Sequence, residues 1–141
     1  MRIDADLVRN IMLYLEKNIE FTENQNGTMS TTSIHWKKLF EDSTLSSKYN
    51  VEDIKYTVYQ LGEANFIKPS ITRAGGGISS IVVDDITWEG HEFLNNIRDD
   101  KVYSKVKTVL SGIKSVSINI ISKTAAEILT GIINGNLGSF S

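Results

Sequence analysis

The sequence predicts a mainly α-helical fold with one small β-hairpin and a C-terminal helical extension. Apolar side chains recur at helical spacing near both ends of the chain, as in amphipathic helices. Between these segments, two runs rich in β-branched residues, 66–73 and 78–84, flank a run of three glycines, which is a hairpin signal. The chain has 141 residues, 40% of them apolar, and no cysteine, so it can bury a core without disulfides.

The N-terminal third predicts one long helix followed by a polar segment. The helix runs from about residue 5 to about residue 19, with Asp4 or Asp6 available as its N-cap. Residues 21–33 are polar and predict a loop or turn, although Met29 to Ile34 could form one short strand.

Two further helices are expected before the hairpin. Apolar residues at positions 36, 39 and 40 predict a short second helix, and Asn50 is a good N-cap for a third helix over residues 50–65. The third helix has a buried stripe and an opposite face that projects outward. The stripe is predicted to be Ile54, Val58 and Leu61, and the opposite face Glu52, Tyr56, Tyr59 and Glu63.

The hairpin over residues 66–84 is expected to end in a flexible tip, because three glycines suggest a loose connection more than a tight turn. After it, Thr87 can cap another helix. Gly90 lies inside that helix, where glycine costs stability, so close backbone packing is expected there.

The order helix, short strand, helix, helix, hairpin is that of a winged-helix domain. Residues 51–67, VEDIKYTVYQLGEANFI, are similar to the third helix of winged-helix proteins, and residues 86–94, ITWEGHEFL, to the segment after the wing. Together with the first helix, they make the chain resemble uncharacterised winged-helix proteins of prophage regions, the YjcQ-like proteins and their relatives. The resemblance spans most of residues 4–125 and implies no catalytic residue. Asn65 replaces the usual glycine, but asparagine also tolerates the left-handed conformation.

The sequence divides at about residue 98 into a winged-helix domain, 1–98, and a C-terminal helical extension, 99–141. The extension predicts a short helix and then a longer one with a heptad-like apolar seam. This seam either docks on the domain or forms a homodimer. Its residues are Ile118, Ile121, Ala125, Ile128 and Ile132.

Catalysis, cofactors and metals are not expected. The two histidines, His35 and His91, are far apart in sequence, and no further ligands lie near them. The Gly75–Gly77 run lacks the following helix and lysine of a phosphate-binding loop. The chain also lacks a signal peptide and any segment apolar enough for a membrane span, so a cytoplasmic protein is expected.

Two functions remain open on the sequence. The first is a DNA-binding regulator of phage or mobile-element type that uses the third helix and the wing. A net charge of −2 and the acidic Glu52 and Glu63 oppose it. The alternative is a protein-interaction module, for which Tyr56, Tyr59 and the apolar seam are candidate anchors. The candidate DNA contacts are Lys37, Lys38, Lys55, Tyr56, Lys68 and Arg73, and Lys101, Lys105, Lys107 and Lys114 are either a solvated face or further phosphate contacts.

Overall fold

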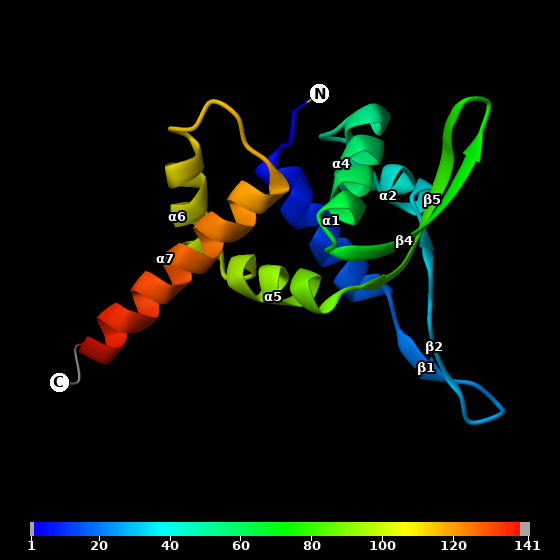
Figure 1. Cartoon of the computed structure of the whole chain (residues 1–141), viewed down its shortest axis with the longest axis horizontal. Helices are drawn as coiled ribbons and strands as arrows, with labels where there is room; N and C mark the ends of the chain where they lie inside the picture. Colours follow the sequence, from blue (N-terminus) through cyan, green and yellow to red (C-terminus); the bar gives the residue numbers. More distant parts are fainter. Residues whose placement is uncertain (1, 139–141) are drawn as a thin grey trace.

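The chain is mainly helical with a long C-terminal helix, as the sequence predicted, and it has two small antiparallel sheets where one hairpin was expected (Figure 1). The computed structural model describes residues 2–138. The elements follow the order α1, β1, β2, β3, α2, α3, α4, β4, β5, α5, α6, α7.

The first helix, α1 (Ala5–Asn18), forms the centre of the core. Asp4 is its N-cap, because its carboxylate accepts a hydrogen bond from the Leu7 amide at 3.1 Å. One face of α1 is almost completely buried and packs against α4 and α5. The buried residues of this face are Leu7, Val8, Ile11, Met12 and Leu15.

The predicted second helix consists of two short helices, α2 (Lys37–Glu41) and α3 (Ser43–Ser46). They are separated at Asp42, whose backbone is extended and whose carboxylate caps α3 by accepting from the Leu45 amide at 3.1 Å. The third predicted helix is α4 (Val51–Glu63), and Asn50 caps it as expected.

Three antiparallel strands form the larger sheet in the order β3 (Ile34–His35), β5 (Gly77–Ile86), β4 (Ile67–Ala74). The predicted flexible tip between β4 and β5 is wrong. Ala74 pairs with Gly77, which leaves a tight two-residue turn at Gly75 and Gly76. Both turn glycines have positive φ angles, 63° and 83°, as a type I′ turn requires.

Residues 21–33 were predicted as a loop with at most one strand, but they contain a second hairpin. β1 (Phe21–Glu23) pairs antiparallel with β2 (Met29–Thr31), and the hairpin projects from the body (Figure 1). The alternation of buried and exposed residues that reveals a strand is absent, because no side chain of β1 or β2 is buried.

The helix α5 (Trp88–Ile97) begins at the base of the β4–β5 hairpin. Thr87 caps it, because the Thr87 hydroxyl accepts from the Gly90 amide at 3.0 Å and donates to the Asn65 carbonyl at 2.6 Å. The close packing expected at Gly90 is confirmed, since an added Cβ would lie 2.1 Å from the Phe66 carbonyl oxygen. Asn65 has a φ of 65°, so the left-handed conformation is confirmed too.

The C-terminal extension docks on this core through α6 (Asp100–Leu110) and the first half of α7 (Ile118–Gly138). Ile118 and Ile121 are 4% and 0% exposed, so this part of the predicted seam is occupied within the chain. The C-terminal half of α7 extends beyond α5 and α6 (Figure 1). No helix within residues 2–138 is long and apolar enough to cross a membrane.

Polar contacts fix the extension to α1. Arg9 donates to the Asp100 carboxylate at 2.7 Å, and the Tyr103 hydroxyl donates to Asp6 at 2.6 Å. Burial favours a higher pKa for Asp6, but the hydrogen bonds from Tyr103 and Lys107 outweigh it and lower that pKa.

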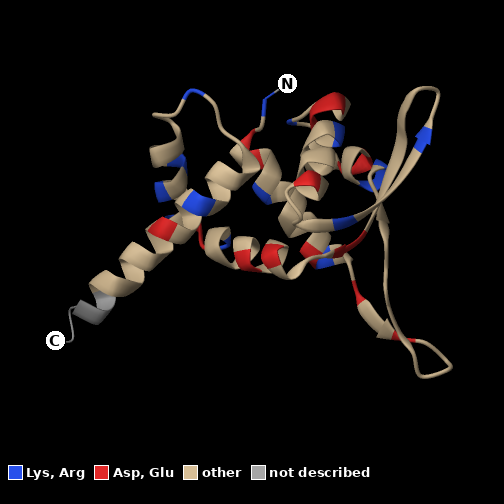
Figure 2. Cartoon of the chain, in the orientation of Figure 1, with Lys and Arg blue, Asp and Glu red and all other residues tan. Residues whose placement is uncertain are grey.

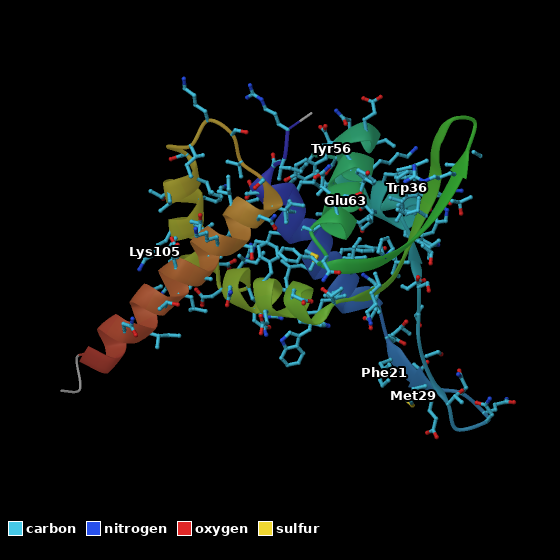
Figure 3. All side chains as sticks on the ribbon, viewed as in Figure 1. Phe21, Met29, Trp36, Tyr56, Glu63 and Lys105 are labelled. Carbon is cyan, nitrogen blue, oxygen red and sulfur yellow. The ribbon has the colours of Figure 1, made fainter. Side chains whose placement is uncertain are left out.

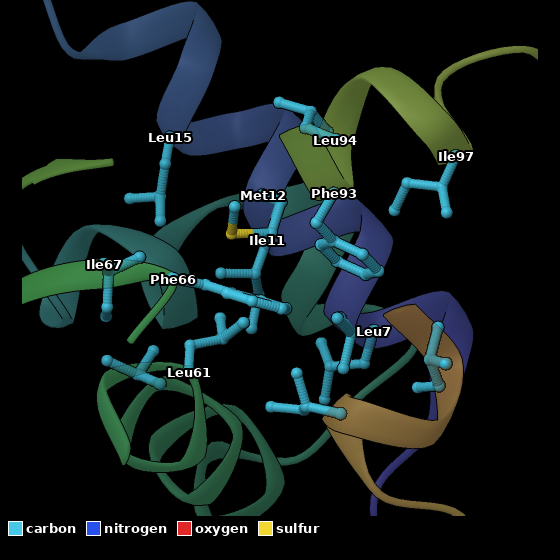
Figure 4. Packing of buried hydrophobic residues seen from close by; sticks show 14 of the residues in the cluster. Leu7, Ile11, Met12, Leu15, Leu61, Phe66, Ile67, Phe93, Leu94 and Ile97 are labelled. Carbon is cyan, nitrogen blue, oxygen red and sulfur yellow. The ribbon is translucent and has the colours of Figure 1, made fainter. Parts of the chain in front are cut away.

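Apolar side chains from α1, α4, α5 and the base of β4 interlock in the centre of the molecule (Figure 4). The Phe66 and Phe93 rings stack with their centroids 4.9 Å apart. This contact joins the start of the β4–β5 hairpin to α5, so the base of the hairpin belongs to the core.

Candidate nucleic-acid interface

The outward face of α4 has the composition that the sequence predicted. Ile54, Val58 and Leu61 are 0% exposed, and Thr57 is buried beside them with its hydroxyl donated to the Asp53 carbonyl. On the other side of the helix, Glu52 and Glu63 are exposed, and Tyr56 and Tyr59 are half-buried. The helix therefore presents two carboxylates and two aromatic rings to its surroundings.

The hairpin base is packed tightly against the C-terminal turn of α4. A Cβ added to Gly62 would lie 3.1 Å from Pro69 Cγ of β4, so the helix and the strand approach closely. The left-handed Asn65 then reverses the chain between them. As a result, the β4–β5 hairpin and α4 have a fixed relative position.

Lys68 and Arg73 are both exposed on β4, as expected for candidate DNA contacts. Arg73 pairs with Ile78, next to the tight turn. The Glu63 carboxylate accepts a hydrogen bond from the Tyr59 hydroxyl and raises the pKa of Tyr59, while Arg73 acts in the opposite direction. Arg73 of β4 therefore acts electrostatically on Tyr59 of α4.

The three lysines on and beside α2, Lys37, Lys38 and Lys55, make different contacts. Lys38 is exposed, while Lys37 pairs with Glu41 at 3.5 Å and keeps 64% of its side chain exposed. The Lys55 ammonium lies 5.0 Å from the Trp36 ring centroid and 5.4 Å from that of Phe40. This cation–π contact directs Lys55 toward α2, away from the outward face of α4.

Figure 2 shows how the charges are distributed around this surface. Lys and Arg positions are coloured on α2 and on β4, and acidic positions are coloured at both ends of α4 and on α2, where Glu41 lies. A ligand placed against α4 would meet the carboxylates of α4 itself and, to the sides of the helix, the cations of α2 and β4. Such a pattern suits a polyanion only if its phosphates lie over those cations.

On the flank of α4 away from β4 lies a cleft of about 380 Å³. Tyr56 and Gln60 of α4 form one wall, and the chain between α6 and α7 forms another. The sequence could not place this connection beside α4, because the two segments are more than fifty residues apart. The cleft is lined by Arg2, Ile3, Tyr56, Gln60, Lys114, Ser115, Val116, Ser117 and Ile118.

The four lysines at positions 101, 105, 107 and 114 do not form one face. Lys114 lies beside α4, while Lys107 pairs with Asp6 at 3.0 Å. Lys105 lies on α6, well apart from Tyr56 (Figure 3), where it lines a groove with Ile128 and Ile132 of α7. Lys101 is exposed on the first turn of α6. Only Lys114 is placed to act together with α4.

The two histidines lie on different elements, His35 on β3 and His91 on α5. His91 is exposed on α5, and His35 Nδ1 accepts a hydrogen bond from the Lys37 amide at 3.0 Å. In the part of the chain that the structure describes, no three His, Cys, Asp or Glu side chains are grouped to hold a metal ion.

The model of the family described as "Hypothetical protein (DUF2513)" matches residues 2–117. An uncharacterised protein of Haemophilus influenzae (strain ATCC 51907 / DSM 11121 / KW20 / Rd) is 27% identical over 135 residues, which cover 89% of this chain and 100% of that protein. No solved structure matches the chain. The expected similarity to uncharacterised proteins is confirmed, and neither description names a winged helix or a prophage.

Proposed function

The chain belongs to the family described as "Hypothetical protein (DUF2513)", and we propose that it is a non-enzymatic winged-helix protein that binds double-stranded DNA. The observation that carries this proposal is the fixed placement of α4 beside a hairpin that bears Lys68 and Arg73. In this reading α4 is the recognition helix and the β4–β5 hairpin is the wing.

The element order supports the winged-helix assignment. Apart from the β1–β2 hairpin inserted after α1, the chain runs from a first helix to the short strand β3, the α2–α3 pair, α4 and the β4–β5 hairpin. The short strand β3 pairs with β5 of that hairpin. Helix-turn-helix proteins place the helix that corresponds to α4 in the major groove. The wing, with Arg73 next to its turn, would then lie along the backbone or in the adjacent minor groove.

The charges fit an arrangement in which cations on α2 and β4 bind phosphates while α4 contacts the bases. Lys38, Lys68 and Arg73 are exposed and would pair with phosphates, which supply most of the affinity. Glu52 and Glu63 would face the bases, where a carboxylate can accept a hydrogen bond from cytosine N4. Binding would therefore be of modest strength and steeply dependent on salt.

The proposal is tested by measuring the affinity for duplex DNA over a salt series that starts at ~50 mM. The log–log slope is expected to be about −0.9 for each phosphate contact, and Lys68→Gln and Arg73→Gln should each make it shallower by that amount. Absence of binding to any duplex at ~50 mM salt rules the proposal out.

A protein-interaction module is the second candidate. It is favoured by the cation–π contact that draws Lys55 toward Trp36 and leaves the outward face of α4 with two tyrosines and two carboxylates. Tyrosines are frequent anchors of protein interfaces. A chain that ignores DNA in the salt series but binds a protein partner, and loses that partner on Tyr59→Ala, would support this candidate.

We extend the first proposal to a homodimer, since DNA regulators commonly bind two half-sites as two-fold dimers. Ile128 and Ile132 are half-buried on the part of α7 that extends beyond the body, and they line a groove with Lys105 and Glu127. Light scattering on the full chain and on Ile132→Asp tests this, because a monomeric wild type excludes it. A regulator of phage or mobile-element type, acting in the cytoplasm, is the corresponding biological role.

A further inference from the structure

The cleft on the tail side of α4 has a lining suited to an anion. Among the described residues that line it, Arg2 and Lys114 are cations and none is a carboxylate. The Tyr56 hydroxyl and the Gln60 amide of α4, and the Ser115 hydroxyl of the connection between α6 and α7, add uncharged donors. Lysine, arginine and hydroxyl donors around one space are the groups that proteins use to contact phosphate oxygens.

The two cations of the cleft are not equivalent. Arg2 also lines a neighbouring cavity together with Asp4 and Asp53, whose carboxylates offset part of its charge. Lys114 lines only the cleft among the described cavities, in the exposed connection between α6 and α7. Lys114 is therefore the stronger source of attraction for an anion in this position.

We infer that this cleft binds a phosphate group, and that on the proposed DNA complex this is a backbone phosphate on the side of α4 opposite the wing. The inference rests on the proposed function for the identity of the ligand. It also accounts for the acidic face of α4, since cations on both flanks would hold the two phosphate backbones while Glu52 and Glu63 lie over the groove between them. The C-terminal extension thereby becomes part of the binding surface.

The first experiment compares Lys114→Gln with Lys101→Gln in the salt series on duplex DNA. Both variants remove one exposed lysine of the extension, but Lys101 lies at the first turn of α6 and Lys114 follows its last turn, beside α4. Lys114→Gln should reduce the slope by about 0.9, and Lys101→Gln should leave it at the wild-type value. Equal slopes for both variants, with DNA still bound, overturn the cleft proposal and leave the proposed function intact.

The second experiment titrates inorganic phosphate into the full chain and follows backbone amide NMR shifts. Saturable shifts at residues 114–117 and Tyr56, lost in Lys114→Gln and kept in Lys101→Gln, support a phosphate site even if the wild type binds no DNA. In that case the ligand is a free phosphate compound and the DNA proposal alone fails. If neither DNA nor phosphate binds, both proposals are overturned.

Discussion

The β4–β5 hairpin has strands of eight and ten residues, whereas β1 and β2 have three residues each. Ile67, Ile81 and Val83 anchor the longer hairpin in the core, and the shorter one contributes no buried side chain. Phe21 and Met29 of the shorter hairpin are 69% and 47% exposed (Figure 3). The β4–β5 hairpin is thus held by its buried side chains, and the β1–β2 hairpin by polar contacts at its base.

Asp84 is the residue that links the two hairpins. Its carboxylate accepts hydrogen bonds from Ser33 at 3.0 Å and from Ser70 at 2.5 Å, and its carbonyl accepts one from Thr31 at 2.7 Å. The short hairpin therefore depends on a strand of the long one, while the reverse does not hold. Three tests address this asymmetry and a fourth addresses the body that carries both hairpins, in decreasing order of expected effect.

The first substitution, Gly90→Ala, attacks the buried base of the long hairpin. The new methyl group would lie 2.1 Å from the Phe66 carbonyl oxygen and 2.8 Å from Ile86 Cγ2, so backbone must shift. We expect a loss of about 3 kcal/mol in the free energy of unfolding, measured by urea denaturation. Gly131→Ala, with no atom within 4 Å of its added Cβ, is the control and should be neutral or stabilising. A small loss at Gly90 would mean that the hairpin base is not part of the core.

The second substitution, Asp84→Ala, should loosen the short hairpin, because it removes the carboxylate that holds Ser33 next to β2. The Thr31 bond to the Asp84 carbonyl and the strand pairing of the long hairpin should remain. The change removes two side-chain hydrogen bonds and should cost about 1–2 kcal/mol. Amide hydrogen exchange shows which segment has opened. The Thr32 amide, bonded to the Glu20 carbonyl at 2.9 Å, should lose protection. Asp85→Ala is the control. It removes the same charge from the same strand but breaks only a local hydrogen bond from the Ile86 amide. Equal losses for both variants would contradict the linking role.

The third test places the same backbone strain in both hairpins. Gly27 and Gly76 have φ angles of 84° and 83°, and neither would bring an added Cβ within 4 Å of another atom. Alanine at either position is disfavoured by about 1 kcal/mol for its left-handed backbone. We expect thermal unfolding to show most of this loss for Gly76→Ala and only a few tenths for Gly27→Ala, because the short hairpin can open locally. Equal shifts in Tm would show that the hairpins unfold together.

The fourth test concerns the body that carries both hairpins. Hydrogen bonds from Arg98 lower the pKa of Glu16 from its usual 4.5, despite partial burial. The pair therefore stabilises the fold above the unfolded pKa and stops doing so as the pH falls through the lower, folded value. The ion pair is substantially exposed, so Glu16→Gln should cost about 0.5 kcal/mol at pH 7 and nothing near pH 2. Glu89→Gln on α5 is the matched control, and a pH-independent loss at Glu16 would refute the prediction.

The sequence predicted the elements whose residues bury a regular stripe. The caps Asn50 and Thr87, the close approach at Gly90 and the left-handed Asn65 all follow from local chemistry, and the structure confirms them. The β1–β2 hairpin was not predicted, because it buries no side chain and its contacts with the body are made to Asp84, more than fifty residues away. The tight turn at Gly75 and Gly76 was mistaken for a loose tip, although positive φ at both positions makes glycine the best turn residue there.

The candidate site was predictable only in part, for a related reason. Periodicity identified the outward face of α4, including Tyr56 and Tyr59, because one helix determines its own faces. The contact of Lys55 with Trp36 and the position of Lys114 beside Tyr56 depend on how distant segments pack. A single sequence carries no local signal of such contacts.

The bond from the Thr87 hydroxyl to the Asn65 carbonyl constrains how the chain can vary in length. It joins the end of α4 to the start of α5, so an added residue at 65–67 or 86–90 would displace both helices. The turns at 24–28 and 75–76 end in solvent and can lengthen without moving buried atoms. Related chains should therefore differ in length at the two hairpin tips and keep the spacing between α4, the hairpin base and α5.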